Sequence, residues 1–168
     1  MPDYRDLNWD IFVLTSYGKE LGRNYYWKIY VSENIIRVII HSVLKVQVGP
    51  NWWNHVVDPK IQGTAARIRN NYLLQIPPKN PGRHDVYCTY LPDLGKILFD
   101  NKGYFYPLVP DVDKIIIGIE RIRLPRNLVG HMNVLTSEEK RSITNFYKLS
   151  NYMAKKLGIL PNFQLQYP

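Results

Sequence analysis

A short stretch late in the chain, from Arg126 to His131, contains side chains that could together act on a phosphodiester. A histidine can take up and release a proton near neutral pH, and an arginine can stabilise charge that develops on a phosphate. Asn127 could orient the imidazole or hold the wall of a cleft. Chance alone produces this arginine–histidine spacing in roughly a quarter of such chains, so the neighbouring sequence must decide its meaning.

The spacing limits what one copy of this stretch could do. Asn127 and His131 lie four residues apart and would share one face of a helix. Arg126 and His131 are five residues apart, which places them about 140° apart around a straight helix. A kink at Pro125 or fraying near Gly130 would ease this separation. A two-fold dimer would solve it better, because both subunits would then contribute arginine and histidine to one cleft.

Helical periodicity dominates the chain that must position these side chains. The segment 24–48 has isoleucine, valine and leucine at helical spacing and predicts a long central helix. Its last residues, 43–48, alternate in the manner of a strand, so a strand is the alternative to a helix at that end. Further helices are predicted at 51–55, 59–74 and 92–100.

The segments on either side of Arg126 are predicted as the last two helices. An apolar stripe predicts the first of them, although its β-branched run leaves a strand as the alternative; its members are Val112, Ile115, Ile116, Ile119 and Ile122. Pro125 should kink or end this helix. Thr136 and Glu139 match a capping box that should begin the final helix, and Gly158 follows its end.

The predicted fold class is therefore all-α, an up-and-down bundle of five or six helices. Residues 1–168 are expected to form a single domain, because each half alone would be short for a good core. Three prolines and a glycine within 76–83 predict a loop that divides the two halves.

Three motifs occur in an order that resembles the HEPN superfamily of small helical domains. The long early helix carries Glu33 and Arg37, Trp52-Trp53 follows it, and the stretch from Arg126 to His131 precedes the capped final helix. The resemblance covers roughly residues 25–157 and is greatest to HEPN domains with a Trp-Trp pair after the early helix. It implies a HEPN-like bundle that acts as a homodimer.

The resemblance also implies a function, that of a metal-independent endoribonuclease, often a toxin or a defence effector. The RNA 2′-hydroxyl would attack its adjacent phosphate and leave a 2′,3′-cyclic phosphate and a 5′-hydroxyl. His131 would act as general acid or base, and Arg126 would stabilise the phosphorane. Asn127 would orient His131, and Glu33 would join the catalytic site from the early helix. The implied partners are RNA, a second copy of the chain, and a protein antitoxin or a larger defence assembly.

A second function remains open on the same motifs. Many HEPN domains have lost catalysis, so the alternative is a non-catalytic module for dimerisation and for RNA or protein binding. In that case His131 would cap helix carbonyls, Asn127 would be a turn residue and Glu33 would simply pair with Arg37. Packing is favoured over base stacking for the large aromatic residues, although the 13 tyrosines of the chain leave RNA stacking as an open alternative; these residues are Tyr25, Tyr26, Trp27, Trp52, Trp53, Tyr104, Phe105 and Tyr106.

Composition narrows the partners and the compartment. A total of 22 Lys and Arg against 14 Asp and Glu gives a formal charge of +8, which favours anionic partners such as RNA. Cys88 is the only cysteine, so an intrachain disulfide is excluded, and His84 beside it does not complete a zinc site. No metal or cofactor is expected. The start of the chain lacks a signal-peptide pattern and no apolar run suits a membrane span, so a cytoplasmic location is expected.

Overall fold

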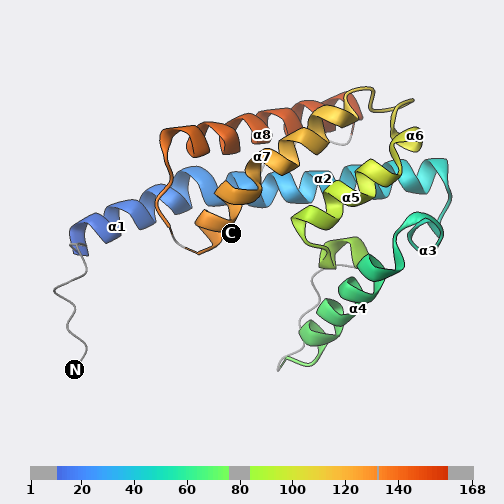
Figure 1. The fold of residues 1–168 in the computed structure, drawn as a ribbon, viewed down its shortest axis with the longest axis horizontal. Coiled ribbons are helices and arrows are strands. Elements are labelled where there is room, and N and C mark those ends of the chain that lie inside the picture. The colour runs from blue at the N-terminus through green and yellow to red at the C-terminus, as the bar shows by residue number, and fades with distance from the viewer. Residues whose placement is uncertain (1–10, 76–83, 132, 159–168) are drawn as a thin grey trace.

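The computed structural model describes residues 11–75, 84–131 and 133–158, and all regular secondary structure within these ranges is helical (Figure 1). The all-α prediction and the bundle character are therefore confirmed for this part of the chain. The proline-rich loop predicted at 76–83 lies outside the described residues. Across the described ranges, no helix combines the length and apolarity needed to cross a bilayer.

The first third of the chain forms one long helical rod. Helix α1 (Ile11–Glu20) passes through a π-helical turn, η2 (Leu21–Tyr26), into α2 (Trp27–Gln47). The prediction began this helix near residue 24 and missed α1, because Gly18 and Gly22 weaken the helical signal. The strand-like end is wrong: α2 remains helical to Gln47, and Gly49 stops it with a φ of 107°.

Helix α2 is the central element of the bundle. One broad face of it is buried, which explains why its apolar residues are not confined to a narrow stripe; the buried apolar members are Ile29, Ile35, Ile36, Ile39, Ile40, Val43 and Leu44. It packs against α8 (Ser137–Lys156), which in turn packs against α7 (Val112–Gly130). Figure 1 shows these three long helices side by side.

Shorter helices close the other end of the molecule. They are α3 (Trp52–Val56), α4 (Pro59–Leu73), the 3₁₀ turn η3 (Asp85–Cys88), α5 (Leu91–Asp100) and α6 (Lys102–Phe105). The predicted helices at 51–55, 59–74 and 92–100 correspond to α3, α4 and α5. The single turn α6 and the 3₁₀ turn η3 were not predicted, because so few residues carry no detectable period.

Helix α7, which carries Arg126, continues through Pro125, where the sequence predicted a kink or an end. The helix neither ends there nor leaves its buried face: it continues to Gly130 with Ile122, Pro125 and Val129 all buried. The missing proline N–H removes one helical hydrogen bond, and burial of the pyrrolidine ring on the core side offsets that loss. Arg126 and Asn127 are consequently held on α7 itself, beyond the proline.

Close packing fixes the position of α7 against α8. A Cβ added at Gly118 would lie only 2.7 Å from the Phe146 ring, so the two helices approach as closely as they do because this residue is glycine. The capping box predicted for α8 is present: the Glu139 N–H donates to the Thr136 hydroxyl, and the Thr136 N–H donates to the Glu139 carboxylate at 2.6 Å. These contacts anchor the helix pair beside Arg126.

Candidate functional site

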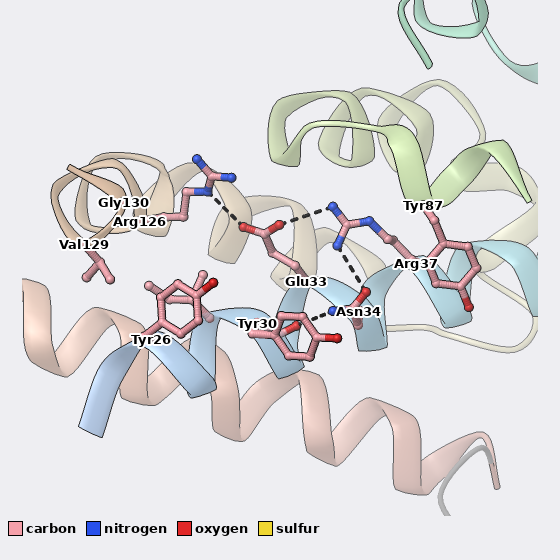
Figure 2. A pocket seen from close by; sticks show the side chains of 10 residues that line it. Tyr26, Tyr30, Glu33, Asn34, Arg37, Tyr87, Arg126, Val129 and Gly130 are labelled. Carbon is pink, nitrogen blue, oxygen red and sulfur yellow. Dashed lines mark hydrogen bonds and ion pairs between the residues drawn. The ribbon is translucent and has the colours of Figure 1, made fainter. Parts of the chain in front are cut away.

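A buried carboxylate on α2 lies at the centre of the candidate site. Glu33 accepts a hydrogen bond from Arg126 Nε at 3.0 Å on one oxygen and from Arg37 at 3.3 Å on the other (Figure 2). Glu33 therefore links α2 to α7, between residues 93 positions apart in the sequence. One carboxylate shared by two guanidinium groups leaves a net positive charge at this point.

Arg37 is held firmly on its other side. Its guanidinium donates to the Thr89 carbonyl at 3.0 Å and contacts the Asn34 side chain at 3.5 Å. Arg37 is buried, so it neutralises Glu33 permanently and is poorly placed to reach a ligand. Its contribution is to fix the carboxylate that orients Arg126.

Arg126 is the exposed member of the trio, with 39% of its side chain accessible. Its Nε is committed to Glu33, and Figure 2 shows the two terminal nitrogens directed away from that carboxylate. The terminal nitrogen Nη1 lies 3.5 Å from the side-chain oxygen Oδ1 of Asn127, a weak contact. Two nitrogens in a fixed plane remain for an incoming anion, which is the geometry that suits phosphate.

Open hollows lie on both sides of Arg126. A groove of about 670 Å³ is bordered by Arg126, Val129 and Gly130 of α7 and by a polar and aromatic face of α2. A second hollow, of about 290 Å³, is bordered by Arg126, Asn127, Arg123 and the Tyr90–Asp93 segment. Because Arg126 lines both, a chain-like ligand could pass over it from one hollow to the other.

His131 lies apart from these groups. It is the C-terminal cap of α7, its backbone N–H donates to the Asn127 carbonyl at 2.9 Å, and its side chain is exposed. It lines neither hollow. Of the four predicted site residues, one copy of the chain thus brings Arg126, Asn127 and Glu33 together and leaves His131 outside.

Two large apolar side chains of α7 are exposed on the same side of the helix as His131. Ile117 and Leu124 are 52% and 63% exposed. Ile117, Leu124 and His131 follow one another at seven-residue intervals, so the three positions project within about 40° of one line along the helix, on the side away from Arg126. This apolar line leads directly to the predicted catalytic histidine.

The sequence interpretation missed the aromatic part of the groove. Tyr26 and Tyr30 line it, and they are 57% and 63% exposed. Packing was expected for Tyr26, and that prediction is wrong; its neighbour Trp27 does pack, edge-on against Tyr147 with ring centroids 4.9 Å apart. The spacing of Tyr26, Tyr30, Glu33 and Arg37 at intervals of four, three and four residues could have revealed one helical face.

The Trp-Trp pair forms a different kind of cluster at the far end of α2. Trp52 is fully buried, and His84 stacks on it with a centroid separation of 4.9 Å and an interplanar angle of 8°. His41 lies 4.6 Å from His84 between ring centroids. Burial lowers the pKa of both imidazoles; His41 lowers that of His84 further, and Lys45 lowers that of His41. The predicted core role of Trp52 and Trp53 is confirmed.

The described part of the chain shows no candidate metal centre, and the comparisons with known proteins give no match. Within 11–75, 84–131 and 133–158, no group of three or more His, Cys, Asp or Glu side chains could hold a metal ion. A scan against models of protein families finds no matching family, and searches of curated proteins and of solved structures find no similar protein. The function must be argued from the geometry around Arg126.

Proposed function

We propose that this protein is a metal-independent endoribonuclease of the HEPN type whose active site forms between two copies of the chain. The observation that carries the proposal is the Glu33–Arg126 ion pair at 3.0 Å. It connects the two helices that the HEPN resemblance names, and it directs the rest of the Arg126 guanidinium toward open grooves. The formal charge of +8 favours the same polyanionic substrate.

Arg126 is the phosphate-binding group in this proposal. Its two terminal nitrogens can donate to two non-bridging oxygens of one phosphate, a bidentate contact that also fixes the direction of the strand. Charge grows on those oxygens as the phosphorane forms, so the contact strengthens in the transition state. Glu33 does not repel the substrate, because it is buried and already paired with two arginines.

His131 reaches the phosphate from the second subunit. The site closes only if the two-fold axis lies beside the groove at Arg126, so that the partner subunit's His131 enters that groove. The exposed Ile117 and Leu124 project from the opposite side of α7, about 160° to 180° from Arg126, and do not form this interface. Each dimer would then have two equivalent sites, or one shared cleft close to the axis.

The reaction follows from these groups. One imidazole takes the proton of the ribose 2′-hydroxyl while the oxygen attacks the adjacent phosphorus. The bond from phosphorus to the 5′-oxygen breaks, and an imidazolium donates the proton that this leaving oxygen needs. The products are a 2′,3′-cyclic phosphate and a 5′-hydroxyl, and DNA is not a substrate because it lacks the attacking group.

A second function, RNA binding without cleavage, is favoured by the position of His131. In one subunit the histidine lines neither groove, so Arg126 and the basic surface could bind RNA with no proton-transfer group in place. A non-catalytic dimerisation or binding module would have this arrangement.

Cleavage in the presence of EDTA separates the two functions. Purified protein should cleave single-stranded RNA under these conditions and leave 2′,3′-cyclic phosphate ends, and His131→Ala should reduce the rate by about 10² to 10⁴. The matched control is His55→Ala, which removes an exposed histidine on α3 far from Arg126. RNA that is bound but left intact would establish the binding function and overturn the ribonuclease.

The proposal extends to a role as a toxin or defence effector. Induced expression of the wild-type chain in a bacterial host should arrest growth and generate new tRNA or mRNA ends, and His131→Ala should do neither. Equal growth with both proteins, at equal abundance, would contradict the toxic role but not the proposed RNA cleavage.

A further inference from the structure

We infer that Tyr26 and Tyr30 form a stacking surface for unpaired bases of an RNA strand whose phosphate lies at Arg126. Tyr90 offers a second such surface on the other side of that arginine. The inference rests on the proposed function in one respect, that Arg126 holds an RNA phosphate. It adds how that strand is held: the bases on both sides of this phosphate are unpaired and stack on these rings.

The tyrosines belong to the same helical face as the ionic centre. Tyr26, Tyr30, Glu33 and Arg37 fall within about 60° of one another around the helix and span about 16 Å along it. Tyr26 is the last residue of the π-helical turn, a feature that often marks functional segments of helices. Figure 2 shows both rings on the α2 side of the groove, opposite the α7 residues Val129 and Gly130.

Exposure distinguishes these rings from the tyrosines that stabilise the fold. More than half of each side chain of Tyr26 and Tyr30 is accessible, and neither ring stacks on another ring within the described part of the chain. The Asn34 side chain donates to the Tyr30 carbonyl at 2.8 Å, which supports the backbone beneath the ring. An exposed aromatic face beside a guanidinium is a combination that binds single-stranded nucleic acid.

The second hollow also places an exposed tyrosine, Tyr90, beside Arg126. Tyr90 is about half exposed, and its backbone is fixed by a capping interaction in which its N–H donates to Asp93 at 3.1 Å. Because Arg126 lines both hollows, a strand crossing it would have an aromatic ring available for the nucleotides before and after the phosphate. Bases within a duplex are stacked on each other, so only unpaired bases could use these rings.

The test measures binding, so that it does not depend on cleavage. The probe is a short single-stranded RNA with 2′-O-methyl groups throughout, which has no 2′-hydroxyl to attack; the comparison is the same strand annealed to its complement. Wild-type protein should bind the single strand at least about tenfold more tightly than the duplex. Tyr30→Ala should weaken single-strand binding by roughly 5- to 150-fold, the loss of one stacked base.

Three controls make the result specific. Tyr30→Trp should retain binding, because it keeps an aromatic face. Tyr152→Ala removes another tyrosine that is more than half exposed, on α8 and outside the groove, and should bind as wild type does. A strand with an abasic nucleotide at the stacked position should bind wild type and Tyr30→Ala equally, which would show that the ring acts on a base.

The outcomes separate this inference from the ribonuclease. Tyrosine-dependent binding without cleavage of unmodified RNA would contradict the proposed ribonuclease function and support the stacking surface. Cleavage that is unchanged in Tyr26→Ala and Tyr30→Ala, with unchanged probe binding, would overturn the stacking surface alone. Failure of the wild-type protein to bind the probe at all would also overturn it.

Discussion

The two ends of α2 combine aromatic rings with ionisable side chains in opposite ways. Near the π-helical turn, the charged groups Glu33 and Arg37 are buried while the rings of Tyr26 and Tyr30 are exposed. Near the other end, Trp52 and Trp53 are buried, and the imidazoles beside them have lowered pKa values. The same helix therefore supports an open ionic groove at one end and a closed aromatic cluster at the other.

The difference shows which end of α2 stabilises the folded state and which end is available to bind a ligand. Burial of a tryptophan stabilises the folded state directly, and a neutral histidine can join such a cluster at little cost. A buried ion pair contributes little net stability, and an exposed tyrosine contributes still less. The groove is consequently the end of α2 whose composition is better explained by binding than by stability.

The largest expected effect on stability lies in the closed cluster. Trp52→Ala should lower the free energy of unfolding by about 3 to 5 kcal/mol, because a fully buried ring is removed. Tyr30→Ala in the open groove should change it by less than about 0.5 kcal/mol. Urea denaturation of both variants compares the two ends, and similar losses would contradict the distinction.

Removal of the buried carboxylate should come next. Glu33→Ala leaves Arg37 buried without its counter-ion, at a cost of about 3 kcal/mol in the free energy of unfolding. The matched control is Glu120→Ala, which breaks the exposed pair with Arg123 and should cost no more than about 0.5 kcal/mol. Equal small effects in both variants would show that Glu33 is not the fixed centre of the groove.

Acidification should weaken the closed cluster more than the open groove. The pKa values of His41 and His84 lie below 6.5 in the folded protein, so the unfolded chain takes up protons first as the pH falls. Stability should therefore be fully present above about pH 6.5 and fall below it. Asp58, Asp111 and Asp113 have lowered pKa values as well, but they act below their ordinary value of 3.8 and so outside this window.

The measurement for this pH effect is the melting temperature between pH 7.5 and pH 5. The wild-type protein should lose several degrees over this range, and His41→Gln should lose less because one of the two imidazoles is absent. A melting temperature that stays constant for the wild type, or rises on acidification, would contradict the sign derived from these two pKa values.

Periodicity predicted α2, α3, α4, α5, α7 and α8 and missed α1 and the single turns, and it could not predict side-chain exposure. The buried stripe of α7 and the capping box of α8 are local patterns, and both are confirmed. The continuation through Pro125 depends on burial of that ring against neighbouring helices, which no local rule contains. The exposed rings of Tyr26 and Tyr30 were unpredictable for the same reason, since tyrosine suits either a core or a binding surface.

The site itself was predicted in part. The resemblance named Glu33, Arg126, Asn127 and His131, and the first three lie together around the two grooves. The separation of His131 from Arg126 follows from their five-residue spacing, which was already expected to prevent one helix from presenting both. Arg37 was considered only as a partner of Glu33, and its hydrogen bond to the Thr89 carbonyl depends on a contact between distant segments.

One comparison tests the central claim, that Arg126 stabilises charge on an RNA phosphate, most directly. Single-turnover cleavage of single-stranded RNA in EDTA should be about 10² to 10³ slower for Arg126→Ala than for the wild type. Glu33 keeps Arg37 as a partner in this variant, so the fold should persist, and Arg141→Ala on the exposed face of α8 should cleave at the wild-type rate. A folded Arg126→Ala protein that cleaves as fast as the wild type would contradict the account.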